Sequence, residues 1–491
     1  MLEYLKKEID QTFTEKGGLA YETTGSDCLD LFATVGALRQ ADDTEIILRF
    51  IRAYTEDPDT AMKLLFYARD IRGGLGERRV FRVILHFLAF NAPQSVKNNL
   101  AFVAEYGRYD DLLSLLGTPC EEEMLKLVAK QFLSDMEALR EDKAVSLLGK
   151  WLPSVNASND ETRQQGKKLA KALGLRESEY RKALTALRGR IRILENDLRE
   201  KDYSFDYAKQ PSRALFKYRK AFIRNDEERY LAFLDAVEEG KSTLHTANVM
   251  PYELVAPILK NDRIWNDTLT PEEKKSLNTT WAALPDFGSD DNALAVIDNS
   301  GSMYSYFDPM PAAVAMSLGL YFAEHNTGAF RNSFITFSDR PQLIELKGET
   351  FADRLRYALS FSEVANTNLE AVFDLILRAA IRNNIPQEEL PARLVIISDM
   401  EYDACVRCNS APVFETVKER YARCGYRLPE VVFWNVASRN RQQPVTQNEQ
   451  GVALVSGTTP RIFSMLAGGN LSPYRFMMDV LGSERYAKIT A

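Results

Sequence analysis

Cysteine and histidine are scarce in this sequence, with five cysteines and three histidines among 491 residues. So few cysteines, and an odd number, cannot form a disulfide framework across a chain of this length, which favours a reducing compartment. The histidines share no spacing, so a zinc hydrolase site or histidine-based acid–base chemistry is poorly supported. One C-x-x-C pair, Cys405 and Cys408, resembles half of a zinc site or a redox pair. A third ligand could only be Cys424 or a distant group, so metal or redox chemistry there is poorly supported. The histidines are His86, His245 and His325.

Long hydrophobic runs are also absent from the sequence. No stretch approaches the roughly 18 uninterrupted apolar residues of a membrane span, and the N-terminal MLEYLKKEID lacks the apolar segment of a signal peptide. The net charge of −7 gives no global attraction to nucleic acid, so any such role must be regional. With 45% hydrophobic and 27% charged residues, the composition is that of a water-soluble globular protein. We therefore expect a cytoplasmic monomer that does not enter a membrane.

The first part of the chain, residues 1–287, reads as a helical array. Apolar residues recur there at three- and four-residue spacing, and strand signals are scarce. Turn markers such as Gly73-Gly74 and Pro153 divide it into segments of ordinary helix length, and NASNDETR, residues 156–163, reads as an exposed loop. Helix density alone suggests a HEAT-like α-solenoid, since no repeat period is clear. Two apolar stripes that illustrate the spacing are Ile47, Phe50, Ile51 and Tyr54, and Met62, Leu65, Phe66 and Arg69.

A second domain is expected over residues 288–491, where the pattern changes to short apolar runs alternating with helical stretches. This alternation predicts an α/β domain with a mostly parallel sheet that is covered on both faces. The predicted strands are Leu294–Ile297, Phe334–Phe337, Leu394–Ile397, Val431–Val436 and Val452–Val455, and two of the predicted helices are Ala312–Glu324 and Leu369–Arg382.

Oxygen-bearing side chains gather where two of these strands end. Asp298, Ser300 and Ser302 form a D-x-S-x-S sequence directly after the first strand, and Asp399 follows the strand Leu394–Ile397. Open α/β sheets bind ligands at the carboxyl ends of their strands. Aspartate and serine oxygens suit a hard cation such as Mg²⁺ or Mn²⁺. Thr367, just before a predicted helix, offers one more hydroxyl, although an isolated D-x-S-x-S is also compatible with an ordinary turn.

This order of residues, D-x-S-x-S, then threonine, then aspartate, resembles the metal-ion-dependent adhesion site of von Willebrand A domains. The resemblance implies a Rossmann-like von Willebrand A domain. It also implies that Ser300, Ser302 and Thr367 bind the metal directly, while Asp298 and Asp399 act directly or through water. A carboxylate or other oxygen of a partner would take the remaining coordination position.

A wider resemblance covers most of the chain. RDIRGGLGERR (69–79), GRYDDLL (107–113), KWLPS (150–154), PSRALFKYRKAF (211–222) and SDMEYD (398–403) are similar to an uncharacterised family that joins a helical, TROVE-like half to a von Willebrand A domain. The layout is remotely similar to that of the Ro autoantigen RNA-binding proteins. That similarity implies small structured RNA as a partner.

Basic residues of the helical half are the candidates for such RNA contacts. Guanidinium groups suit phosphate, and cations interleaved with aromatic residues suit RNA. Ion pairs with Asp70, Glu77 and Asp110, or solvated faces of amphipathic helices, explain the same residues structurally. The loop Gly73-Gly74-Leu75-Gly76 lacks the GK[ST] ending of a P-loop and reads as a helix–helix turn. The candidate RNA-binding residues are Arg72, Arg78, Arg79, Arg213, Lys217 and Lys220.

Two hypotheses about function follow from these patterns. In the first, the protein is a non-enzymatic, metal-dependent binding protein that contacts small structured RNA. In the second, it is a metal-dependent adaptor or scaffold whose cation is completed by an acidic residue of a partner protein. An enzyme is the weakest interpretation, because no nucleophile–base pair is visible in the sequence.

Overall fold

The computed structural model describes residues 10–259, 269–288, 292–305, 307–338, 340–361, 368–402, 413–466 and 471–491. The chain forms two compact units. Unit 1 comprises Met1–Asp57 and Pro211–Glu484, and unit 2 comprises Pro58–Gln210 and Arg485–Ala491. Residues from both sides of position 288 belong to unit 1, and the domain boundary there remains a prediction. No helix in the described ranges has the length and apolarity needed to cross a membrane.

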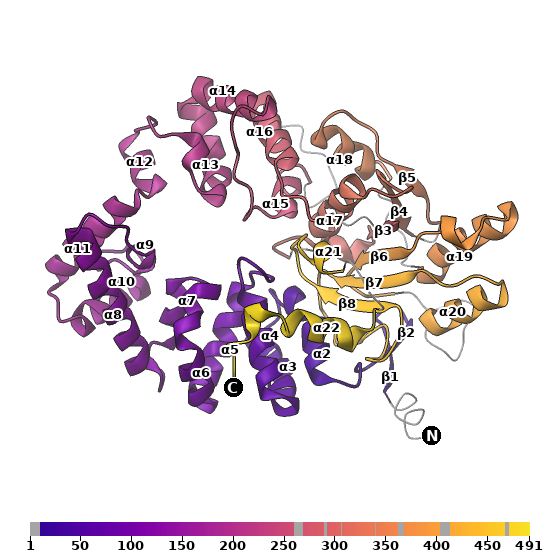
Figure 1. The fold of residues 1–491 in the computed structure, drawn as a ribbon, viewed down its shortest axis with the longest axis horizontal. Coiled ribbons are helices and arrows are strands. Elements are labelled where there is room, and N and C mark those ends of the chain that lie inside the picture. The colour runs from indigo at the N-terminus through magenta and orange to yellow at the C-terminus, as the bar shows by residue number, and fades with distance from the viewer. Residues whose placement is uncertain are drawn as a thin grey trace. The chain divides into compact units, whose positions relative to one another are not determined.

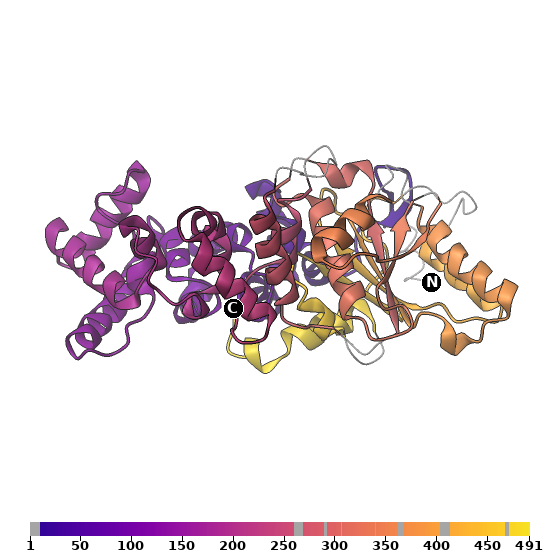
Figure 2. The same ribbon diagram turned by 90° about the horizontal axis from the view of Figure 1, so that it is seen from above.

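Unit 2 is helical over residues 58–210, as both ribbon views show (Figures 1 and 2). The stripe of helix α4 (Pro58–Arg69) is confirmed, because Met62, Leu65, Phe66 and Arg69 are all buried. The glycine loop forms the expected turn between α4 and α5 (Arg78–Asn91). The other helices are α6 (Pro93–Asn99), α7 (Val103–Tyr106), α8 (Glu121–Arg140), α9 (Leu148–Trp151), α10 (Asp160–Ala172), α11 (Glu177–Ile191) and α12 (Leu194–Glu200), with 3₁₀ turns η2 (Leu100–Phe102), η3 (Tyr109–Leu115) and η4 (Tyr207–Lys209).

Two local predictions in the helical half were wrong. The segment 156–163 is not all loop, because Asn159 accepts a hydrogen bond from the Thr162 amide and caps α10, which begins at Asp160. In α3 (Asp43–Glu56) the buried stripe lies one position earlier than predicted, with Ile46 and Phe50 inside and Ile51 36% exposed. Arg49 takes a place on the buried face, since its guanidinium is paired there with Glu45.

Unit 1 contains helices that precede the sheet in sequence and a short hairpin that the sequence did not predict. The hairpin pairs β1 (Gln11–Phe13) with β2 (Leu19–Tyr21) in antiparallel register. The helices are α2 (Asp27–Phe32), α3, α13 (Ser212–Asn225), α14 (Glu227–Glu238), α15 (Pro251–Val255) and α16 (Pro271–Ala282), with the 3₁₀ turn η1 (Val35–Ala37).

The sheet of unit 1 has six strands in the order β5-β4-β3-β6-β7-β8. All neighbouring pairs are parallel except β4 and β5, so the prediction of a mostly parallel sheet is confirmed. Strand β5, on the antiparallel edge, was not predicted. The strands are β3 (Ala293–Asp298), β4 (Ser333–Phe337), β5 (Leu343–Glu345), β6 (Arg393–Ser398), β7 (Glu430–Asn435) and β8 (Val452–Ser456).

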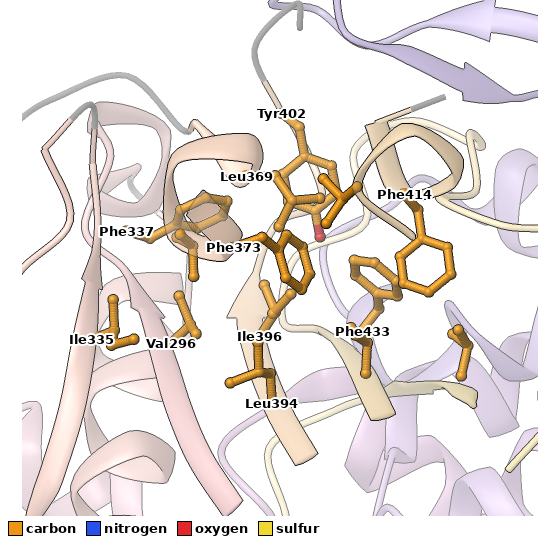
Figure 3. Packing of buried hydrophobic residues seen from close by; sticks show 14 of the residues in the cluster. Val296, Ile335, Phe337, Leu369, Phe373, Leu394, Ile396, Tyr402, Phe414 and Phe433 are labelled. Carbon is orange, nitrogen blue, oxygen red and sulfur yellow. The ribbon is translucent and has the colours of Figure 1, made fainter. Parts of the chain in front are cut away.

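Side chains alternate between the two faces of the sheet, and both faces are covered. On one face Val296, Ile396 and Phe433 pack against Phe373 of α19 (Leu369–Asn383) and Phe414 of α20 (Val413–Arg423), as Figure 3 shows. The opposite face is covered by α17 (Pro311–His325). The remaining elements of this part are η5 (Gly301–Tyr304), α18 (Phe351–Leu359), η6 (Gln387–Glu389), α21 (Ile462–Met465), α22 (Pro473–Leu481) and η7 (Glu484–Tyr486).

Helix α17 lies close to the sheet because it carries a glycine at the contact. A methyl group on Gly319 would come 2.2 Å from Cδ1 of Ile297 on β3. Thirteen of the fifteen residues of α17 are buried, from Pro311 to Ala323, so this helix and β3 are fixed by packing along their whole length. Asp298, the last residue of β3, is therefore held by rigid neighbours.

Candidate metal centre

The candidate site lies at the point where the chain reverses its direction of winding through the sheet. From β3 the chain first builds β4 and β5 on one side, then crosses back to build β6, β7 and β8 on the other. The carboxyl ends of β3 and β6 are neighbours at this switch point, where open α/β sheets bind ligands. Asp298 ends β3, and Asp399 directly follows β6.

Three of the predicted oxygen ligands lie within one turn of chain. The Ser300 amide donates a hydrogen bond of 2.8 Å to Oδ1 of Asp298. The hydroxyl oxygens of Ser300 and Ser302 lie 3.0 Å apart and share a hydrogen bond. Asp298 is fully buried and Ser300 is 1% exposed. The turn therefore gathers the carboxylate and the two hydroxyls as the D-x-S-x-S spacing predicted.

The second carboxylate, Asp399, is also buried, at 3% exposure. Its Oδ1 accepts a hydrogen bond of 3.2 Å from the Glu401 amide, and its Oδ2 accepts one of 2.9 Å from Nη2 of Arg439. Ser398, the residue before it, donates a 2.6 Å hydrogen bond to Oδ2 of Asp298 and so ties the ends of β6 and β3 together. Thr367, the fifth predicted ligand, lies outside the described residues.

The electrostatics of the site disfavour two ionised carboxylates without a cation. Burial, and then the charge of Asp399, raises the pKa of Asp298 to about 6. Burial and the carboxylates Asp298, Asp399 and Glu401 together raise the pKa of the Tyr402 phenol well above its ordinary value. Both directions follow first from burial and then from neighbouring carboxylates at the ends of β3 and β6. A bound cation would relieve the repulsion.

The donor set fits a hard divalent cation. Oxygen ligands from few carboxylates, together with hydroxyls and water, are what Mg²⁺ accepts. Within the described ranges, no three His, Cys, Asp or Glu side chains form a metal-binding group, so a cation here would depend on the serine hydroxyls beside the two aspartates. The amide side chain of Asn299, between Asp298 and Ser300, is buried with neither polar atom hydrogen-bonded. An unsatisfied amide of this kind is commonly paired with ordered water.

Sequence reasoning missed several residues around the site. Ser398 carried a usable signal, since it precedes Asp399 directly at the strand end. Glu401 is fully buried and accepts hydrogen bonds from the amides of Glu15, Asn440 and Gln442, the first from backbone and the others from side chains. Arg439 and Glu15 gave no local signal, because each reaches the site from a distant part of the sequence.

The predicted RNA-contacting residues divide between the two units. Arg213 and Lys220, in unit 1, form ion pairs with Glu253 and Glu273, and Lys217 lies 4.7 Å from the centre of the Tyr218 ring. Arg72, Arg78 and Arg79 belong to unit 2 and are exposed, and Arg72 donates to the Glu105 carbonyl. Among the neighbouring arginines, Arg82 forms the predicted ion pair with Asp110. Arg69 and Arg82 also pair with Asp111, a carboxylate that was not among the predicted partners. Cys405 and Cys408 lie outside the described residues.

Unit 2 has another group of cations, which we call the Trp151 cluster: Arg78, Arg108, Lys150 and Trp151. The guanidinium carbon of Arg108 lies 4.5 Å from the centre of the Trp151 ring, and Nζ of Lys150 lies 5.6 Å from it. Burial, and then the charges of Arg69 and, less strongly, Arg78, lower the pKa of Arg108. None of these three cluster cations has an ion pair with a carboxylate among the described residues.

Comparison with protein families gives two matches, which meet between residues 286 and 292. A domain of unknown function, DUF2828, matches residues 14–126 and 122–286, and another, DUF7788, matches residues 292–473. The two DUF2828 segments span more than half of the 491 residues, and the chain belongs to this family.

One relative and one solved structure match most of the chain. The uncharacterized protein L728 of Acanthamoeba polyphaga mimivirus is 29% identical over 508 residues, which cover 96% of this chain and 87% of the viral protein. The crystal structure of the Ro (RSR) protein of Deinococcus radiodurans aligns with 93% of this chain and 100% of its own, at 14% identity and a TM-score of 0.35.

Proposed function

We propose that the protein is a non-enzymatic binding protein that depends on a divalent cation, Mg²⁺ or Mn²⁺. The cation would be held by Asp298, Ser300, Ser302, Thr367 and Asp399 in a domain of von Willebrand A type. The observation that carries the proposal is the meeting of buried Asp298 and Asp399 with the Ser300 and Ser302 hydroxyls at the switch point. When bound, the cation would supply an open coordination position for an anionic oxygen of a partner.

Binding, and not catalysis, is what the surrounding residues support. The hydroxyls of Ser300 and Ser302 bond to each other, and no described histidine is hydrogen-bonded to either of them. Nδ1 of His86 and Nδ1 of His325 each contact a backbone carbonyl, of Ser114 and Tyr321. A serine nucleophile needs a base within hydrogen-bond reach.

The metal proposal is tested on the full chain by Mn²⁺ titration, followed by electron paramagnetic resonance. Wild type is expected to bind one Mn²⁺ that Mg²⁺ displaces, and Asp298→Asn to lose that site. Asp479→Asn is the matched control, since the Asp479 side chain is 71% exposed and remote in sequence from the site. Equal Mn²⁺ binding by wild type and Asp298→Asn would overturn the proposal.

RNA binding by unit 2 is the second candidate function, and the distribution of charge favours it. Unit 2 has 28 lysines and arginines against 22 aspartates and glutamates, a formal charge of +6. Unit 1 has 34 against 47 and carries −13. Unit 2 is therefore basic although the whole chain has a net charge of −7. The Trp151 cluster also offers cations that could bind phosphate beside an aromatic ring.

The salt dependence of RNA binding tests this candidate. The probe is a labelled RNA hairpin with a single-stranded tail, measured by fluorescence anisotropy at several salt concentrations. Replacing Arg78 and Lys150 by glutamine should lower the affinity and reduce the slope of log K against log salt by roughly 1.5. The control replaces Lys126 and Lys143, which are paired with Glu122 and Glu141 in the same unit. A probe that shows no salt-sensitive complex with wild type contradicts RNA binding and favours a protein partner for the metal site.

A further inference from the structure

Arg439 is a cation that lies at the candidate metal centre and pairs with Asp399. Its Nη2 lies 2.9 Å from Oδ2 of Asp399, and its Nη1 lies 3.4 Å from Oε2 of Glu15. Asp399 is 1% exposed as a side chain and Arg439 is 26% exposed, so the ion pair is largely shielded from water. A metal ion and this guanidinium would therefore compete for the same carboxylate.

The guanidinium is incompletely satisfied where it lies. Its Nε is buried and has no hydrogen-bond acceptor. A buried donor without a partner is costly, so the present position of Arg439 depends on its attraction to Asp399. Neutralising Asp399 with a divalent cation would remove that attraction.

Glu15 is the alternative partner for Arg439. This carboxylate belongs to the turn between β1 and β2, is 50% exposed and lies within reach of the same guanidinium. Side-chain Nδ2 of Asn440, the residue after Arg439, already donates to Oε1 of Glu15 at 3.1 Å. Arg439 therefore needs only a small movement to exchange one carboxylate for the other.

The hairpin that carries Glu15 is attached to the chain directly after Asp399. The Glu15 amide donates to Oε2 of Glu401 at 2.9 Å, and the Thr14 hydroxyl donates to the carbonyl of Tyr402. A change at Asp399 is thus two or three residues from the points that fix the hairpin. A change at Asp399 on metal binding would therefore be transmitted to the N-terminal hairpin, residues 10–22.

We propose that Arg439 is an internal competitor of the metal: it neutralises Asp399 in the metal-free protein and transfers to Glu15 when the cation binds. The exchange sets the metal affinity and couples the occupancy of the site to the N-terminal hairpin. This inference rests on the proposed metal site.

Mn²⁺ titration of the full chain tests the competition. Arg439→Gln removes the competitor and should tighten Mn²⁺ binding about tenfold, the factor that corresponds to roughly 1.4 kcal/mol. Glu15→Gln removes the alternative partner and should weaken Mn²⁺ binding. Arg441→Gln is the control, since Arg441 lies two residues away and pairs with Glu45 instead. Equal or weaker binding by Arg439→Gln would overturn the inference, whereas no Mn²⁺ binding by wild type and all variants overturns the metal site itself.

Hydrogen exchange provides a second readout that does not depend on the stability of the Arg439 variant. Mg²⁺ should slow exchange of the amides of residues 14–18 in wild type, because Arg439, once released from Asp399, pairs more closely with Glu15. The slowing should be absent in Glu15→Gln, whose exposed side chain leaves the fold intact. Exchange that is unchanged by Mg²⁺ in wild type, at concentrations where Mn²⁺ competition shows the site filled, overturns the transfer to Glu15.

Discussion

The Ser398 hydroxyl donates a 2.6 Å hydrogen bond to the buried carboxylate of Asp298, although the two residues are 100 positions apart in the sequence. This bond joins the carboxyl ends of the neighbouring strands β6 and β3. From these ends the chain continues to opposite halves of the sheet. Together with the hydrogen bond from the Ser300 amide, the bond from Ser398 fixes the orientation of the Asp298 carboxylate at the end of β3.

Replacing Asp298 by asparagine should stabilise the metal-free protein at alkaline pH. Because the folded pKa of about 6 lies above the ordinary value of 3.8, its stabilising contribution is present below pH 3.8 and is lost as pH rises through 6. At pH 8 wild type should therefore be less stable than Asp298→Asn, by up to about 3 kcal/mol.

Calorimetry in a chelator at pH 4.5 and pH 8 checks this prediction. The difference between the two proteins should shrink at the lower pH, and saturating Mg²⁺ at pH 8 should reverse their order. A large loss of stability in Asp298→Asn at pH 8 without metal would show that the carboxylate is structural.

Removing the hydroxyl of Ser302 should weaken cation binding, whereas removing that of Ser305 should not. Ser302→Ala removes a direct oxygen ligand of the proposed site, and we expect Mn²⁺ affinity to fall about tenfold or more. Ser305→Ala, three residues later, removes a buried hydroxyl without a hydrogen-bond partner and should leave affinity and stability nearly unchanged. Similar affinities for both variants would place Ser302 outside the coordination shell.

The stability of unit 2 should depend strongly on the buried carboxylate of Asp111. Asp111 is fully buried and accepts from Arg69, which is 1% exposed, and from Arg82. Asp111→Ala would leave a buried guanidinium unpaired, and we expect a loss of about 3–5 kcal/mol. Asp110→Ala is the control, because Arg82 keeps Asp111 as a partner, and a loss of about 1 kcal/mol or less is expected. Denaturant unfolding measures both.

Two glycine-to-alanine changes should have opposite signs. Gly319→Ala places a methyl group 2.2 Å from Cδ1 of Ile297 in the contact between α17 and β3, and is expected to destabilise the fold. Gly189→Ala in α11 meets nothing within 4 Å and should stabilise its helix by up to about 1 kcal/mol. Thermal unfolding of the two variants distinguishes packing from helix propensity.

Local pattern was sufficient for the sheet and for part of the site. Apolar runs placed five strands within one residue at each end, because strands buried on both faces read as continuous hydrophobic segments. Strand β5 has the exposed residues Leu343 and Glu345 on either side of one buried isoleucine, and so gives a weak signal. Asp298, Ser300 and Ser302 stand at alternate positions of one short stretch of sequence, which is why their convergence was predictable.

Contacts with residues distant in the sequence determine the positions of side chains that local pattern did not predict. Arg49 is buried on α3 because Glu45 and the Ser438 hydroxyl satisfy it, and Ser438 lies 389 positions away. A stripe drawn from apolar residues alone therefore missed the true face of the helix. Arg439 reaches Asp399 in the same way, through a pairing of loops that no local spacing encodes.

The attachment of residues 485–491 to unit 2 has a consequence for biosynthesis. Arg485 and Tyr486 bond to the carboxylate of Asp70, and Arg485 is translated 415 residues after it. Unit 2 leaves the ribosome long before its own closing segment does, and unit 1 is interrupted by it between Asp57 and Pro211. Each unit is therefore assembled from segments that are not contiguous in the sequence, and unit 2 closes only after residues 485–491 have been synthesised.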